Sequence, residues 1–164
     1  MAAASSDPVT ANPEHERATA VAWRAIGQRE RTVAEMRALL GRRPFEPDAI
    51  DAAVTALQDA GFLDDAAYAR RFAEDKRVLD RWGRERIARD LSRRGVAPDL
   101  IEQALSLQDR DGELGAALEL LAVRVPEPPA SDRDRDRAWR LLVRRGYEPE
   151  LAYEAVRAHA RDAA

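Results

Sequence analysis

A nine-residue phrase occurs three times in this chain, and each copy begins 51 residues after the previous one. The copies begin at Leu40, Leu91 and Leu142, and each holds an Arg-Arg pair followed by a proline and an acidic residue. A fixed period without insertions is typical of repeat proteins, whose units pack against their neighbours. The repeat therefore predicts an extended contact surface rather than an enclosed catalytic pocket.

The residues around each phrase predict helices and no strands. Apolar residues recur at helical spacing, Thr32 and Glu35 form a capping-box pair, and a glycine follows the last periodic residue of several segments. A proline fits the first turn of the helix that follows each phrase. We therefore expect an all-α protein of nine helices, arranged as three tandem three-helix repeats in an elongated, curved, solenoid-like array.

The same capping residues, glycines and prolines predict the domain boundaries. Residues 1–14 lack periodicity and are expected to form a disordered tail. The first repeat is expected at 15–62, the second at 63–108 and the third at 109–164. The third contains a proline-rich loop at 125–131.

Charge is distributed unevenly along the chain. The net charge is −3, yet residues 66–108 contain ten basic and seven acidic residues and so carry +3. Arginine outnumbers lysine 26 to 1. Guanidinium groups pair with carboxylates or phosphates through two parallel hydrogen bonds, which makes the second repeat the best candidate for contact with an anionic partner.

Within this repeat, Arg86, Arg89 and Arg93 have the spacing of one helix face, opposite the stripe from Ile87 to Leu91, and we interpret them as a basic ridge. An alternative is a solvated face, with the Arg-Arg pairs complementing the negative ends of helix dipoles. Eight arginines are the candidate partner-binding or DNA-binding residues, the last two of second rank: Arg70, Arg71, Arg86, Arg89, Arg93, Arg94, Arg144 and Arg145.

Residues suited to catalysis are few and scattered. The chain has no cysteine, its only histidines are His15 and His159, and it contains no phosphate-binding loop. We expect no catalytic, cofactor or metal site and no enzymatic activity. The lack of cysteine, of a signal-peptide pattern and of a long apolar run favours a cytoplasmic protein without a membrane partner. We expect it to be a monomer.

The three tryptophans are expected in hydrophobic cores. Trp23 and Trp139 lie within apolar helical patterns, whereas Trp82 lies at a helix junction between Arg81 and Gly83. A contact between Trp82 and a partner protein remains an alternative for this residue.

Three segments carry a family resemblance. Gly61-Phe62-Leu63-Asp64-Asp65, followed by Tyr68-Ala69, resembles the opening signature of the RecX regulatory proteins. The segment Gly83–Val96 is similar to the next element of that family, and Arg140–Tyr147 to its closing element. The resemblance covers roughly residues 18–160, and the proline-rich loop of the third repeat departs from the family pattern.

The resemblance implies a tandem three-helix protein that binds the RecA recombinase filament on single-stranded DNA. Proteins of this family suppress the filament's ATP hydrolysis, strand exchange and coprotease activity, and so modulate recombination, DNA repair and the SOS response. The expected partner is the RecA nucleoprotein filament, with single-stranded or double-stranded DNA as a further partner.

Two other functions fit the residues alone. Helix-turn-helix modules also consist of short helices with basic faces, and such a module would bind DNA without RecA and with steep salt dependence. A structural adaptor for an amphipathic helix would instead need a hydrophobic groove and neither DNA nor RecA.

Overall fold

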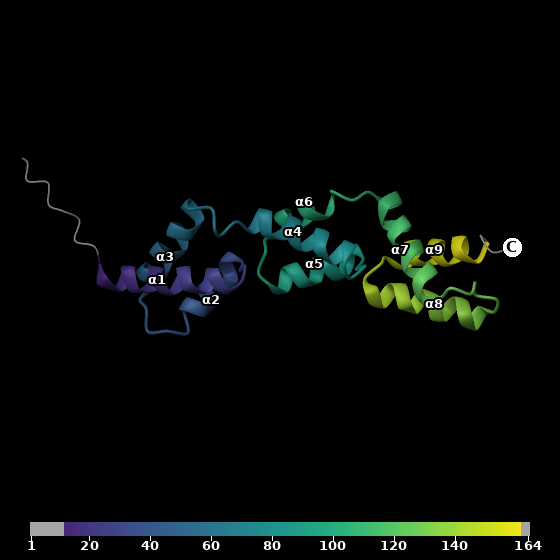
Figure 1. Cartoon of the computed structure of the whole chain (residues 1–164), viewed down its shortest axis with the longest axis horizontal. Coiled ribbons are helices and arrows are strands. Elements are labelled where there is room, and N and C mark those ends of the chain that lie inside the picture. Colours follow the sequence, from purple (N-terminus) through teal and green to yellow (C-terminus); the bar gives the residue numbers. More distant parts are fainter. Residues whose placement is uncertain (1–11, 162–164) are drawn as a thin grey trace, which may run out of the picture. The chain divides into compact units, whose positions relative to one another are not determined.

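The computed structural model describes residues 12–161, and these contain nine α-helices and no strand (Figure 1). The predicted all-α class is confirmed. The tail predicted for residues 1–14 lies mostly outside the described residues, and the first helix begins at Pro13. By its internal packing the chain divides into two compact units, Met1–Asp64 and Asp65–Ala164. The domain boundaries predicted at residues 62 and 108 stay a prediction.

The first unit is a bundle of three helices, α1 (Pro13–Gln28), α2 (Val33–Leu40) and α3 (Pro47–Asp59). Thr32 and Glu35 form the predicted capping box at the start of α2, and Pro47 lies in the first turn of α3. Helix α1 packs mainly against α3, and both contact α2. The buried core combines alanines of α1 with larger residues of α2 and α3, among them Met36, Leu40 and Leu57.

Trp23 does not fill this core. Its side chain is 39% exposed and meets Phe62 edge-on, with 4.9 Å between ring centroids. Because α1 buries small residues, Ala18, Ala22 and Ala25, the helix approaches α3 closely and leaves Trp23 at the flank. The prediction of a core tryptophan is therefore wrong at this position.

The second unit contains two bundles. The second bundle consists of α4 (Asp65–Val78), α5 (Arg84–Arg93) and α6 (Pro98–Leu105), and the third of α7 (Arg110–Arg124), α8 (Asp132–Arg145) and α9 (Pro149–Arg161). Each bundle has its own buried core.

A close backbone crossing joins these two bundles. The Gly83 N–H donates to the Arg145 carbonyl at 2.9 Å, and the Glu85 N–H donates to the Gly146 carbonyl at 3.0 Å. A Cβ atom on Gly83 would overlap the carbonyl carbon and oxygen of Gly146. Gly146 itself has φ +91°, a conformation that favours glycine. The crossing therefore needs glycine on both sides.

Side chains reinforce the crossing. An Arg145 Nη1 donates to the Asp80 carbonyl at 2.8 Å, and the Tyr147 hydroxyl donates to the Arg81 carbonyl at 3.2 Å. Arg81 has φ +50°, which is unfavourable for a side chain of its size. These bonds hold the α4–α5 connection in a strained conformation and link the two bundles through main-chain atoms.

Candidate partner-binding surface

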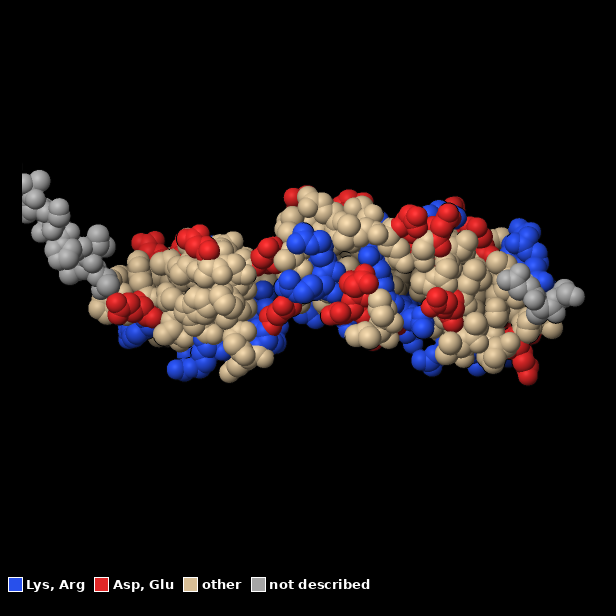
Figure 2. Space-filling view, turned by 45° about the horizontal axis from the view of Figure 1, so that its top comes forward, with Lys and Arg blue, Asp and Glu red and all other residues tan. Residues whose placement is uncertain are grey.

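The structure places six of the eight candidate arginines on the second bundle. Arg70 and Arg71 are exposed on α4, and Arg89 and Arg93 are exposed on α5. Arg86 on α5 and Arg94 at its end are half-buried. Figure 2 shows basic and acidic side chains side by side over this part of the chain, so the surface is arginine-rich but not uniformly positive.

Several of the basic groups on this bundle are held by acids or rings, among them Arg84 by Glu102 and Arg81 by Glu119. Arg93 pairs with Asp90 one turn back along α5, and Lys76 pairs with Asp80 at 2.6 Å. Within residues 12–161, Arg70 and Arg89 form no ion pair. These two exposed guanidinium groups are therefore the most available for an external anion.

The half-buried cations and the aromatic rings form a continuous alternating series, which we call the cation–ring ladder. The Arg94 guanidinium lies over the Phe72 ring at 5.0 Å, and Lys76 lies 5.7 Å from the same ring. Lys76 is also 4.7 Å from the Trp82 ring, and the Arg86 guanidinium lies 3.9 Å over that ring. The ladder thus joins α4 to both ends of α5.

Cation–ring contacts of this kind contribute roughly 0.5–1 kcal/mol each at exposed sites. They also restrict the side chains that take part, so Arg86 and Arg94 are held in place before any partner arrives. Tyr68 extends the series, since its ring stacks on Phe72 with centroids 6.0 Å apart. Phe72 and Lys76 were not among the sequence candidates, although their i,i+4 spacing on a helix could have indicated the contact.

Arg144 and Arg145 lie at the end of α8 in the third bundle. Arg145 is half-buried and bonded to the Asp80 carbonyl, which gives it a role in the bundle crossing. Arg144 is exposed and lines a cleft between α7 and α8. At the crossing, the residue after α8 lies directly against Arg86. A Cβ atom on Gly146 would overlap Arg86 there.

Burial changes the proton affinity of two groups near this surface. Desolvation raises the pKa of Tyr147 to about 12, with the nearby Glu113 carboxylate adding to the effect. Desolvation lowers the pKa of Arg77, whose Nη2 donates to the carbonyls of Ala104 and Leu105 at the end of α6. Both side chains donate to main-chain carbonyls inside the second unit.

The described part of the chain contains neither a cluster of metal-binding side chains nor a helix that could span a membrane. Between residues 12 and 161 no three His, Cys, Asp or Glu side chains come together in a way that could hold a metal ion. None of the helices described is long and apolar enough to span a bilayer.

The fold and surface define a class: an all-α protein of repeated three-helix domains that presents arginines interleaved with aromatic rings. Residues 64–105 match the family description "RecX, second three-helix domain". The chain is 35% identical over 150 residues to the regulatory protein RecX of Deinococcus radiodurans, an alignment covering 92% of this chain and 72% of that protein. The chain belongs to the RecX family of regulatory proteins.

A further relative supports the family, and a solved structure shares the fold. The chain is 31% identical over 153 residues to the regulatory protein RecX of Mycobacterium marinum, covering 91% of this chain and 88% of that one. A crystal structure of RecX from Lactobacillus salivarius matches with a TM-score of 0.80 at 19% identity, over 90% of this chain and 97% of the other. The family resemblance predicted from the three sequence segments is confirmed.

Proposed function

We propose that this protein binds the RecA filament on single-stranded DNA and inhibits its ATPase, strand-exchange and coprotease activities. The observation that carries the proposal is the second bundle, since its residues match the RecX domain family and also form the arginine-rich surface. Through this activity the protein would modulate recombination, DNA repair and the SOS response.

The contact surface we propose consists of Arg70, Arg71, Arg89 and Arg93, with Arg86 and Arg94 held beside them by the cation–ring ladder. Exposed guanidinium groups suit both the carboxylates of a protein partner and the phosphates of DNA. Arg144 remains a second-rank candidate, and Arg145 supports the surface through the bundle crossing.

Inhibition follows if the protein binds one filament conformation more tightly than the others. The backbone crossing between the second and third bundles opposes bending of one against the other. If these two joined bundles contact two neighbouring RecA protomers, they would oppose the rearrangement of the protomers that ATP turnover requires. The reason is that a ligand favours the conformation to which it binds more tightly.

The proposal is tested by reversing three exposed arginines, Arg70, Arg89 and Arg93, to Glu. If each contributes about 1 kcal/mol, the concentration giving half-inhibition of the RecA ATPase should rise about 100-fold. The matched control reverses three exposed arginines of the first bundle, Arg24, Arg42 and Arg43, which is the same change in charge. Equal inhibition by wild type and by the second-bundle variant would exclude this surface.

A DNA-only control separates the proposal from the helix-turn-helix alternative. Fluorescence anisotropy with a labelled single-stranded oligonucleotide, without RecA, should show weak binding at physiological salt. Tight binding that falls steeply with salt and survives the removal of RecA would instead favour an independent DNA-binding module.

A further inference from the structure

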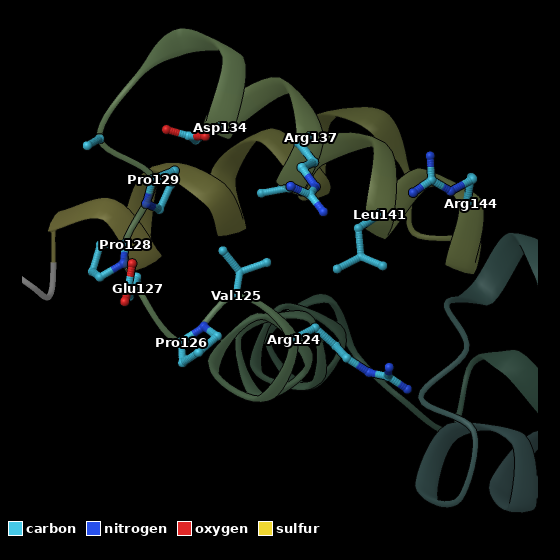
Figure 3. A pocket seen from close by; sticks show the side chains of 12 residues that line it. Arg124, Val125, Pro126, Glu127, Pro128, Pro129, Asp134, Arg137, Leu141 and Arg144 are labelled. Carbon is cyan, nitrogen blue, oxygen red and sulfur yellow. The ribbon is translucent and has the colours of Figure 1, made fainter.

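The third bundle contains an open cleft between α7 and α8. Both helices pack against α9, and residues 125–131 connect them. The cleft encloses about 600 Å³ and is lined by the end of α7, the proline-rich connection and one face of α8 (Figure 3). Its volume falls within the range of sites that hold small ligands or a few partner side chains.

The proline-rich wall of this cleft is fixed at both ends. At the start, the Val125 carbonyl lies 2.7 Å from His159 Nε2 on α9, and a carbonyl can only accept a hydrogen bond. At the end, Ser131 and Asp134 form a capping box at the start of α8, and Pro129 is buried. Because proline also restricts the backbone, a partner would find the wall already formed and would lose less entropy on binding.

Charge within the cleft is separated along its length. Figure 3 shows Glu127 and Asp134 toward one end and Arg124 and Arg144 toward the other, with Arg137 between them. All three arginines are exposed, and among the described residues none of them forms an ion pair.

The apolar part of the cleft lies among these guanidinium groups. Val125 and Leu141 are half-buried and face the space between α7 and α8 (Figure 3). The lining contains no aromatic residue. Single-stranded nucleic acids are commonly bound by aromatic rings on which bases stack, so this lining is better suited to an aliphatic side chain.

We propose that this cleft binds an acidic peptide segment of another protein. An aliphatic side chain of the peptide would lie between Val125 and Leu141, and its carboxylates would pair with Arg124, Arg137 and Arg144. Residues 1–11 and 162–164 of the chain itself contain one acidic residue each, so they lack the charge that the cleft requires. The cleft shares only Arg144 with the candidate arginines for RecA, and the proposal does not depend on RecA binding.

The test uses the full chain and a displayed library of random peptides. Peptides are selected on the wild-type protein after depletion on the double variant Arg124→Glu, Arg137→Glu. We expect the retained peptides to carry several Asp or Glu residues around a Leu, Ile, Val or Met. The most enriched peptide is then labelled, and its Kd is measured by fluorescence anisotropy against single variants.

We expect Arg124→Glu and Arg137→Glu each to weaken binding about tenfold, because each reversal removes an ion pair and adds a like charge. The control is Arg157→Glu, an exposed arginine on α9 that lies off this cleft, and it should bind within about twofold of wild type. Circular dichroism checks that all variants remain helical.

Three results would overturn the proposal. The first is a selection that enriches nothing over the depleted variant. The second is an enriched peptide that lacks acids or an aliphatic residue, or that binds all variants equally. The third is full displacement of the peptide by an unlabelled oligothymidylate, which would make the cleft a nucleic-acid site.

Discussion

At the level of single residues, Gly83 and Gly146 are tightly constrained, because a Cβ atom on either would overlap the other side of the crossing. Alanine at position 83 would place a Cβ inside the van der Waals radii of the Gly146 carbonyl, and main-chain atoms have little room to move. We expect Gly83→Ala to lower the free energy of unfolding of the second unit by about 3 kcal/mol, as overpacking does. Urea denaturation monitored by circular dichroism measures this loss of unfolding free energy.

The matched control for that substitution is Gly115→Ala. Gly115 lies inside α7, and a Cβ there would meet nothing within 4 Å. Since alanine favours a helix over glycine, the control should stabilise the protein by about 0.5–1 kcal/mol. Similar effects of the two substitutions would contradict the account of the crossing.

Tyr147 makes the crossing sensitive to alkaline pH. Its pKa is raised from 10 to about 12, so the folded state favours the protonated phenol. The resulting stability is fully present below pH 10 and is lost as pH rises through 12, by about 2–3 kcal/mol. A phenolate also cannot donate to the Arg81 carbonyl.

Tyr147→Phe separates this effect from the titration of other groups. The variant should be about 1 kcal/mol less stable at neutral pH, because the Arg81 carbonyl loses a donor. Between pH 10 and 12 its stability should fall less than that of wild type. Parallel pH profiles for the two proteins, measured by urea denaturation, would show that Tyr147 does not titrate as described.

At the level of elements, the cation–ring ladder couples α4 to α5. Trp82→Leu keeps an apolar side chain and removes two of the four cation contacts, to Lys76 and Arg86. We expect a loss of about 1–2 kcal/mol in unfolding free energy and a several-fold weaker inhibition of the RecA ATPase. Inhibition equal to wild type would mean that the ladder holds no residue that RecA contacts.

The helices and their caps could be predicted because they depend on neighbours in sequence. Thr32 and Glu35 lie three residues apart, and Ser131 and Asp134 repeat the pattern. The same holds for the family resemblance, which depends on short segments. Local rules were sufficient for these caps, whose partners lie within one helical turn.

The crossing depends on residues distant in sequence, as does the ladder's contact between Arg94 and Phe72, and the pattern could not reveal these contacts. Gly83 could be interpreted as a helix breaker, but its contact with Gly146 could not be foreseen. Arg145 was assigned to a helix dipole or a partner, whereas its guanidinium bonds the Asp80 carbonyl 65 residues away. Trp23 was assigned to a core to which α1 contributes alanines instead.

At the level of the whole molecule, the second unit has its own cores and its own internal bonds. We expect a fragment of residues 65–164 to be helical and to unfold cooperatively in urea, since no core residue of either bundle comes from the first unit. A shorter fragment of residues 65–108 should be markedly less stable, because it lacks the bonds from Arg145 and Tyr147. A disordered 65–164 fragment would contradict the expectation that the second unit folds on its own.

The backbone crossing also has a consequence for synthesis. Its hydrogen bonds join Gly83 and Glu85 to Arg145 and Gly146, so the second bundle leaves the ribosome well before the residues that complete its last connection. Until residue 147 has emerged, the nascent α4–α5 turn lacks the partners that hold Arg81 in its unfavourable conformation. The final docking step is therefore expected to follow translation of α8.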